Sequence, residues 1–139
     1  VPERLNRCLR RSDFMPFGPV MLGEDWPLWL RNYEAARHAA EFMTVCFDCA
    51  PAMRDRFPAV VHVDGTARAQ LAREATNPGL SAILKALKKR TGASVALNTS
   101  FNMHEEPIVR TPAEAMAAFR EAGLDALILG PCLVEGVRQ

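Results

Sequence analysis

Apolar residues recur at helical spacing in residues 76–92, "TNPGLSAILKALKKRTG". Asn77 has the side chain of a helix N-cap, Pro78 suits the first turn, and Gly92 can end the helix. The expected apolar face consists of Leu80, Ile83, Leu84 and Leu87. The pattern therefore predicts a helix with defined ends.

The same signals return in residues 110–123, "RTPAEAMAAFREAG". Thr111 can cap this helix, Pro112 fits its first position, and Glu114 can complete a capping box with Thr111. Gly123 provides the stop. A second helix is predicted here.

Short apolar runs separate and flank these helices. The predicted strands are "EFMTVCF" (41–47), "AVVHVDG" (59–65), "SVAL" (94–97) and "LDALILG" (124–130), and a further helix is predicted over 27–40, "PLWLRNYEAARHAA". Strands alternating with helices predict an α/β domain. The short connection between the first two strands predicts some antiparallel pairing, and hence a mixed sheet flanked by helices.

Two polar clusters follow predicted strands, and ligands bind at the carboxyl ends of strands in such sheets. "HVDGTARAQ" (62–70) presents Thr66 and Arg68 after a glycine turn, and a guanidinium suits a phosphate or carboxylate. "LNTSFN" (97–102) offers amides and hydroxyls that could hold a small planar acyl group. The alternative at both places is a turn that satisfies nearby backbone groups.

A third cluster, "RCLRRSDFMPFGPV" (7–20), is rich in arginine and interrupted by proline. Arg10 and Arg11 could form a phosphate clamp, or this could be a solvated basic edge. Elsewhere, "CFDC" at Cys46–Cys49 resembles a redox or zinc motif. Because the other cysteines and the histidines are scattered singly, we interpret these cysteines as packing residues and expect no metal site.

Composition narrows the class of protein. The 139 residues are 49% hydrophobic and 24% charged, which suits one globular domain, and the net charge of +1 gives no general attraction to nucleic acid or membranes. The sequence contains no membrane-length apolar run and no secretory signal at its start, so we expect a cytoplasmic protein. The start at Val1 leads us to expect part of a longer polypeptide.

Four stretches, taken in order, resemble the C-terminal domain of the NodU/CmcH-type O-carbamoyltransferases. They are "RRSDFMPFGPVML", "FPAVVHVDGTARAQL", "ALNTSFNMHEEPIVRTPAEAMAAF" and "LDALILGPCLVE". The resemblance implies a single YrdC-like α/β domain over residues 1–139 that converts ATP, with Mg²⁺, and carbamoyl phosphate to carbamoyl-adenylate. It also implies a partner, an N-terminal actin-like ATPase-type domain absent from this chain, that transfers the carbamoyl group to a sugar or natural-product hydroxyl.

The resemblance also implies roles for individual residues. It assigns catalytic roles to Arg11, Arg68 and Ser100, with Arg11 and Arg68 on phosphates. Nucleotide- or substrate-binding roles fall on Arg10, Thr66, Asn98, Thr99 and Asn102, and Asn98 and Ser100 would hold the carbamoyl group and the adjoining phosphate.

The sequence departs from the family pattern at three positions. Leu9 and Met15 replace cations found in some members, and Glu105 stands where the family often has glycine, which could alter the turn after "LNTSFN". Two rival functions remain open: an inactive nucleotide- or RNA-binding module, and a structural partner of the missing domain. Against RNA binding stand the low net charge and the lack of interleaved aromatic and basic residues.

Overall fold

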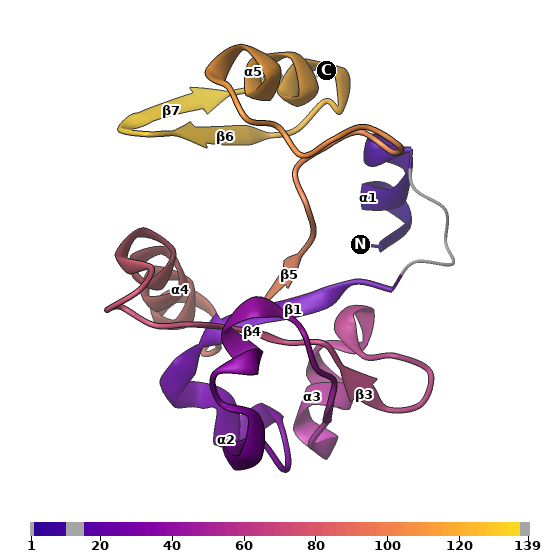
Figure 1. The fold of residues 1–139 in the computed structure, drawn as a ribbon, viewed down its shortest axis with the longest axis vertical. Helices are drawn as coiled ribbons and strands as arrows, with labels where there is room; N and C mark the ends of the chain where they lie inside the picture. Colours follow the sequence, from indigo (N-terminus) through magenta and orange to yellow (C-terminus); the bar gives the residue numbers. More distant parts are fainter. Residues whose placement is uncertain (1, 11–15, 137–139) are drawn as a thin grey trace. The chain divides into compact units, whose positions relative to one another are not determined.

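The structure is a computed structural model that describes residues 2–10 and 16–136, and the chain divides into two compact units (Figure 1). The sheet unit is Pro16–Thr99, and the hairpin unit is Val1–Met15 together with Ser100–Gln139. Across the described ranges, every helix is too short or too polar to span a bilayer.

The sheet unit carries most of the secondary structure. In chain order its elements are β1 (Gly18–Leu22), η1 (Gly23–Asp25), α2 (Trp26–Trp29), η2 (Glu34–Ala36), η3 (Ala39–Phe42), β2 (Phe47–Asp48), α3 (Pro51–Arg56), η4 (Pro58–Val60), β3 (Thr66–Ala67), β4 (Gln70–Ala72), α4 (Pro78–Thr91) and β5 (Ala96–Asn98).

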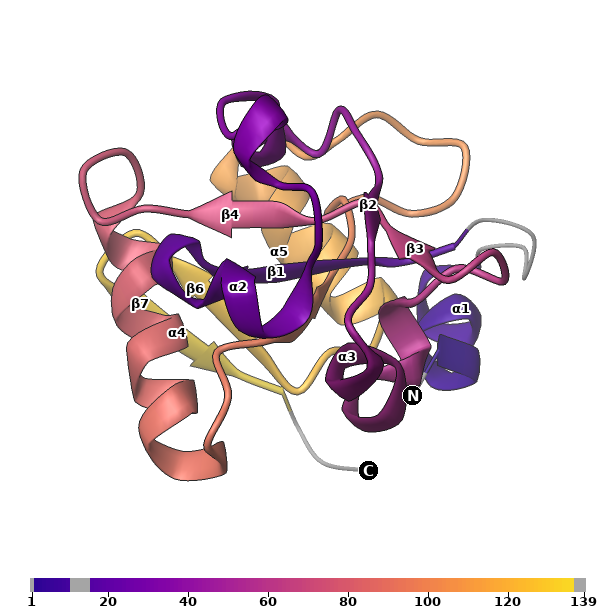
Figure 2. The same cartoon turned by 90° about the horizontal axis from the view of Figure 1, so that it is seen from below.

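A three-stranded mixed sheet forms the centre of this unit, in the order β4-β1-β5. Strand β1 runs parallel to β4 and antiparallel to β5, and Figure 2 shows β4 running alongside β1 with α4 nearby. Strands β2 and β3 form a separate antiparallel pair. The predicted α/β class with a mixed sheet is confirmed.

Helix α4 confirms the predicted helix and both of its ends. The Asn77 side chain accepts a hydrogen bond from the Leu80 amide at 3.2 Å, and Gly92 adopts the left-handed conformation at the other end. Leu84 is buried against β1 and β4, with Leu80 and Leu87 partly buried beside it. Ile83, placed on the apolar face by the sequence pattern, is instead 49% exposed.

A buried polar network ties α4 to the sheet. Asp25 lies just after β1, and its carboxylate accepts hydrogen bonds from Lys88 Nζ and Ser94 Oγ, both at 2.6 Å. The Ser94 hydroxyl in turn accepts a bond from the Leu22 amide at 3.3 Å. Asp25 and Ser94 are both buried, so this network stabilises the junction of β1, α4 and the segment leading into β5.

Two predicted strands are wrong. Residues 41–47 end the η3 helix and turn at Met43, whose φ of 55° is left-handed, so only Phe47–Asp48 pairs as a strand. Residues 59–65 form the end of η4 and a turn, and the Val63 side chain is fully exposed. Phe47 and Val60 are buried, but the rest of these apolar residues lack the burial that a strand in the core would give them.

The predicted helix over 27–40 is also wrong as a continuous element. The helix that includes Pro27 ends at Trp29, and Leu30 forms a β-bridge with Cys49. Asn32 then adopts a left-handed φ of 58°, which breaks any helical continuation. Pairing with another segment therefore overrides the local helical pattern here.

The hairpin unit contains two helices and a β-hairpin in its described residues. Its elements are α1 (Pro2–Leu9), α5 (Pro112–Glu121), β6 (Ala126–Leu129) and β7 (Cys132–Glu135). The predicted capping box of α5 is present, because Thr111 Oγ1 accepts from the Glu114 amide and the Glu114 carboxylate accepts from the Thr111 amide.

One face of the β6–β7 hairpin packs on α5 (Figure 1). The buried contacts join Ala115 and Phe119 of α5 to Leu127 of β6. A second small core joins Leu9 of α1 to Met103 and Ala122. The hairpin unit therefore unites the start of the described chain with its end.

Candidate functional site

Two predicted site residues flank the first residue of β1. Gly18 pairs with Asn98 of β5 in the antiparallel register. Gly18 also approaches the backbone of Arg68, because a Cβ atom at position 18 would collide with the Arg68 carbonyl oxygen and with Met43 Cε. Arg68 and Asn98 therefore lie at the same end of the three-stranded sheet.

The Arg68 side chain is exposed at this end of the sheet. It has no hydrogen-bond or ion-pair partner among the residues that the structure describes. A guanidinium carries five N–H donors in a planar fork, so Arg68 retains its full capacity to bind an anion.

Thr66, in contrast, is engaged in a turn. Asp64 Oδ1 accepts hydrogen bonds from the Thr66 amide at 2.9 Å and from its hydroxyl at 2.8 Å, and these bonds lower the pKa of Asp64 below its ordinary value. His62 Nδ1 lies 3.2 Å from the same hydroxyl. The side chain of Thr66 thus serves the turn, and its predicted binding role stays a prediction.

Asn98 is half-buried and holds its amide in a defined orientation. Its Nδ2 donates to Gln70 Oε1 at 2.7 Å and lies 3.2 Å from Met43 Sδ. Thr99 follows, also half-buried, as the last residue of the sheet unit. The amide at the strand end is therefore oriented by these two contacts.

Ser100 and Asn102 belong to the hairpin unit. Ser100 is exposed, whereas Asn102 Nδ2 closes a turn by donating to the carbonyls of Met103 and Glu106, both at 2.9 Å. Within this turn Glu105 has a φ of 66°, a conformation that favours glycine. Glu105 thus adopts a left-handed conformation at the position where the family pattern often has glycine.

Of the arginine cluster, Arg10 is described and Arg11 lies outside the described residues. Arg10 has a left-handed φ of 55°, and its guanidinium forms an exposed ion pair with Glu121 at 3.0 Å. Exposed pairs of this kind are weak, so Arg10 could exchange Glu121 for a more highly charged anion. Ion pairing in the hairpin unit is a competing, structural role for this arginine.

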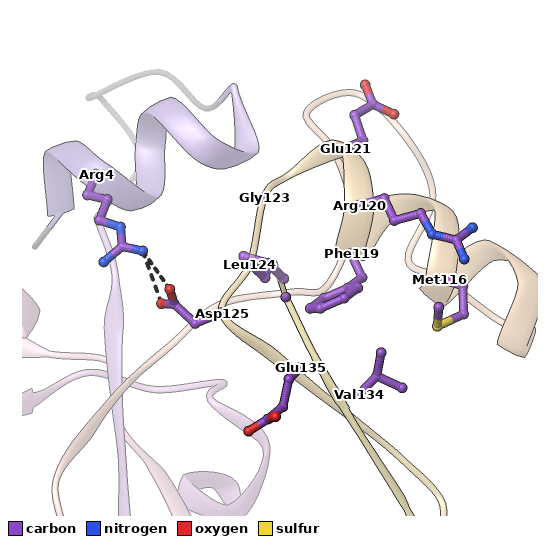
Figure 3. Close-up of a pocket in the computed structure, with 11 residues that line it drawn as sticks. Arg4, Met116, Phe119, Arg120, Glu121, Gly123, Leu124, Asp125, Val134 and Glu135 are labelled. Atoms are coloured by element: carbon purple, nitrogen blue, oxygen red, sulfur yellow. Dashed lines mark hydrogen bonds and ion pairs between the residues drawn. The ribbon is translucent and has the colours of Figure 1, made fainter. Parts of the chain in front are cut away.

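A hollow of about 820 Å³ lies in the hairpin unit (Figure 3). The Arg4–Asp125 ion pair lies at its edge, and Phe119, Leu124 and Val134 contribute apolar surface. Its other charged groups also carry both signs, so the hollow has no excess of positive charge for a triphosphate. None of the sequence-predicted site residues that the structure describes lines it.

The cysteines of "CFDC" differ in environment. Cys49 is buried, and this burial raises the pKa of its thiol above the ordinary value, whereas Cys46 is exposed. In the ranges 2–10 and 16–136, no three His, Cys, Asp or Glu side chains gather as metal ligands would. Only Cys49 has the environment of a packing residue.

Replacing Cys46 by valine and Cys49 by threonine together is expected to leave the zinc content and nucleotide binding of the chain unchanged, since neither thiol is proposed to bind metal. Elemental analysis and calorimetry would measure both. In the parent chain, the exposed Cys46 should react with a thiol reagent well before the buried Cys49. Stoichiometric zinc in the parent that disappears in the double variant would show a metal site instead.

Sequence reasoning missed Gln70 as a neighbour of the site. Its amide contacts Asn98 only because the strand register brings β4 and β5 to opposite sides of β1. The one signal in the sequence was its place two residues after Arg68 in the cluster at 62–70.

Comparison with known proteins gives a match along almost the whole chain. Residues 1–136 match a family model described as carbamoyltransferase C-terminus. The chain is 37% identical over 133 residues to nodulation protein NolO of Bradyrhizobium diazoefficiens. It is 35% identical over 134 residues to nodulation protein NolNO of Sinorhizobium fredii.

A third relative extends this set. The chain is 27% identical over 128 residues to the 3'-hydroxymethylcephem-O-carbamoyltransferase of Amycolatopsis lactamdurans. The three alignments cover 95%, 96% and 92% of this chain but only 24%, 20% and 24% of the relatives. The chain thus spans about a quarter of their length, and the matched part of NolO, NolNO and the cephem enzyme is one portion of a longer protein.

Proposed function

The chain belongs to the carbamoyltransferase C-terminus family, and on that premise we propose that it binds ATP and carbamoyl phosphate and forms carbamoyl-adenylate. The observation that carries the proposal is the joint placement of Arg68 and Asn98 beside Gly18. A cation with no partner among the described residues and an oriented amide, both at one sheet end, suit a ligand that combines phosphates with a small planar acyl group.

The proposed chemistry balances as two steps. Water cleaves carbamoyl phosphate to carbamate and inorganic phosphate. A carbamate oxygen then attacks the α-phosphorus of ATP, forming the new P–O bond as the bond to the β-phosphate breaks, and pyrophosphate leaves with the electron pair. Both reactants of the second step are anions, so the protein has to offset their mutual repulsion.

The residues divide this work by charge. Arg68, together with Arg10 and Arg11, is proposed to bind phosphates, while Asn98 and Ser100 contact the acyl group. Because these are positioning and electrostatic roles, no side-chain nucleophile is needed. The predicted binding roles of Thr66, Thr99 and Asn102 are kept as part of this proposal.

Magnesium enters the proposal as a companion of the nucleotide. The described residues offer no three-ligand cluster, which fits an ion bound mainly by phosphate oxygens and water, the usual arrangement for Mg²⁺ with nucleotides. When bound, the ion would neutralise phosphate charge.

The carbamoyl group is proposed to pass to a hydroxyl of a sugar or natural product in a further part of a longer polypeptide. The name of the Amycolatopsis lactamdurans relative specifies a hydroxymethyl acceptor for that protein, and the chain spans 24% of its length. Acceptor choice would then lie in an N-terminal transfer domain, which is the proposed partner of this chain.

Arg68→Ala is expected to weaken binding of ATP with Mg²⁺ by about 1.5–3 kcal/mol, the range for a hydrogen bond to a charged group. Titration calorimetry on the purified chain would measure the change. Arg90→Ala is the matched control, since it removes another exposed arginine of the sheet unit, at the end of α4, and should leave the affinity unchanged. Equal ATP affinity in parent and Arg68→Ala, at equal melting temperature, would reduce Arg68 to a surface residue.

The ATP titration, together with a measurement of RNA binding, separates the rival functions. A folded chain that shows no heat with millimolar ATP would favour a structural partner. Binding of RNA that falls steeply with salt, without ATP binding, would instead indicate a nucleic-acid module.

A further inference from the structure

The orientation of the Asn98 amide determines which of its polar atoms is available to a ligand. Its Nδ2 is used by Gln70 Oε1 at 2.7 Å and by Met43 Sδ at 3.2 Å. Its Oδ1 has no hydrogen-bond partner among the described residues. Asn98 therefore offers a ligand an acceptor and not a donor.

The orientation of Gln70 is set in turn by the backbone. Gln70 Nε2 donates to the carbonyl oxygen of Glu41 at 3.4 Å. A backbone carbonyl can only accept, so Gln70 has to direct its nitrogen toward Glu41 and its oxygen toward Asn98. The Glu41 carbonyl therefore fixes the direction of both hydrogen bonds, the one that it accepts from Gln70 and the one that Gln70 accepts from Asn98.

The sheet register explains why the two amides meet. Gln70 pairs with Val20 and Asn98 with Gly18, so by strand alternation both amides fall on the face of β1 to which Gly18 and Val20 belong. Gly18 has no side chain to intervene, and Met43 occupies the space that a Cβ atom there would need. The contact between the amides is thus built into the fold of the sheet unit.

We propose that Asn98 Oδ1 accepts a hydrogen bond from the amino group of the carbamoyl moiety, and that Gln70 is the positioning residue that enforces this selectivity. The proposal rests on the proposed function and adds how the site recognises its acyl group. A carbamoyl group carries an N–H donor where an acetyl group carries a methyl. A methyl would leave the Asn98 oxygen unpaired, which a site built around an acceptor penalises.

The test compares carbamoyl phosphate with acetyl phosphate, which differ only in that NH₂ or CH₃. Calorimetry measures the affinity of the chain for each, in the presence of an ATP analogue whose α–β methylene bridge prevents adenylate formation. The parent should prefer carbamoyl phosphate roughly fivefold to tenfold, the value of one net hydrogen bond. Gln70→Met keeps a similar length but removes the strong oxygen acceptor, so the Asn98 amide can rotate and the preference should fall to below about twofold.

Gln70→Glu provides the rescue that a purely structural role would not show. A carboxylate cannot donate to the Glu41 carbonyl, but either of its oxygens can accept from Asn98 Nδ2. The preference for carbamoyl phosphate should therefore persist even though the added negative charge weakens both ligands. A preference retained in Gln70→Met, or lost equally in Gln70→Glu, overturns this inference and leaves the proposed function standing. If the parent chain binds ATP but neither acyl phosphate, the proposed function fails and the inference fails with it.

Discussion

Replacing Ser100 by alanine is expected to slow carbamoyl-adenylate formation by about 10²–10³-fold, the usual cost of losing one donor directed at developing charge. Asn98→Ala should also slow it, because it removes the acceptor that is proposed to orient the amino group of the carbamoyl moiety. ATP affinity should change far less, because these neutral groups are proposed to contact the acyl group while the arginines bind the phosphates. The measurement is the carbamoyl-phosphate-dependent exchange of labelled pyrophosphate into ATP, followed beside ATP calorimetry.

A matched control keeps this result specific. Thr44→Ala removes an exposed hydroxyl of the sheet unit whose one partner among the described residues is the Ala39 carbonyl, and the exchange rate should not change. Thermal melts would show whether Asn98→Ala also loosens the sheet through its lost contact with Gln70. Unchanged exchange in both site variants, or loss of ATP affinity with no further effect on rate, would identify this strand end as a turn or a nucleotide contact.

Lys88→Met is expected to lower the free energy of unfolding by about 3 kcal/mol, because it leaves a buried carboxylate without its cation; the low end of the range for breaking a buried ion pair applies since the Lys88 side chain is itself 42% exposed. Asp25 is buried with a side-chain exposure of 6%, and Lys88 Nζ is its only cationic partner among the described residues. Methionine keeps helix propensity and the apolar stem, so the loss should come from the stranded carboxylate. Denaturant titration would show a lower midpoint with an unchanged slope.

Lys85→Met makes the same chemical change one turn earlier on α4, where Lys85 pairs with Glu74 on the surface. That pair is solvated, so the denaturation midpoint should remain close to that of the parent. Equal destabilisation by the two variants would mean that the Asp25 network adds no more than a surface pair.

Helices with local signals were predictable from the sequence. Asn77 with Gly92, and Thr111 with Glu114, act within a few residues of the helix ends that they define, so α4 and α5 have the expected limits. The strands were less accessible. Strand β1 was not predicted. It contains Pro19, a residue that is rare inside strands, but its pairing with β4 begins only at Val20, beyond the proline.

The residues of the candidate site were predictable from the sequence, but their partners were not. The polar side chains of the strand end are apparent in "LNTSFN", and Arg68 was predicted from its place after a glycine turn. The partners of these residues were not visible, because Gln70 reaches Asn98 from 28 positions away through the register of two strands. The buried Asp25–Ser94 contact, 69 positions apart, was hidden for the same reason.

The selectivity proposed for Asn98 depends on a backbone carbonyl, that of Glu41, and not on the Glu41 side chain. Every amino acid supplies a backbone carbonyl, so a substitution at position 41 that keeps the path of η3 would leave the atom that Asn98 presents unchanged, although it would remove the ion pair between the Glu41 carboxylate and Arg73 at 2.6 Å. A comparison of residue identities at that position would not reveal its influence. Insertions or deletions that reroute the chain between η3 and β2 would move this carbonyl. The proposed preference for a carbamoyl group would then depend on the path of the main chain there.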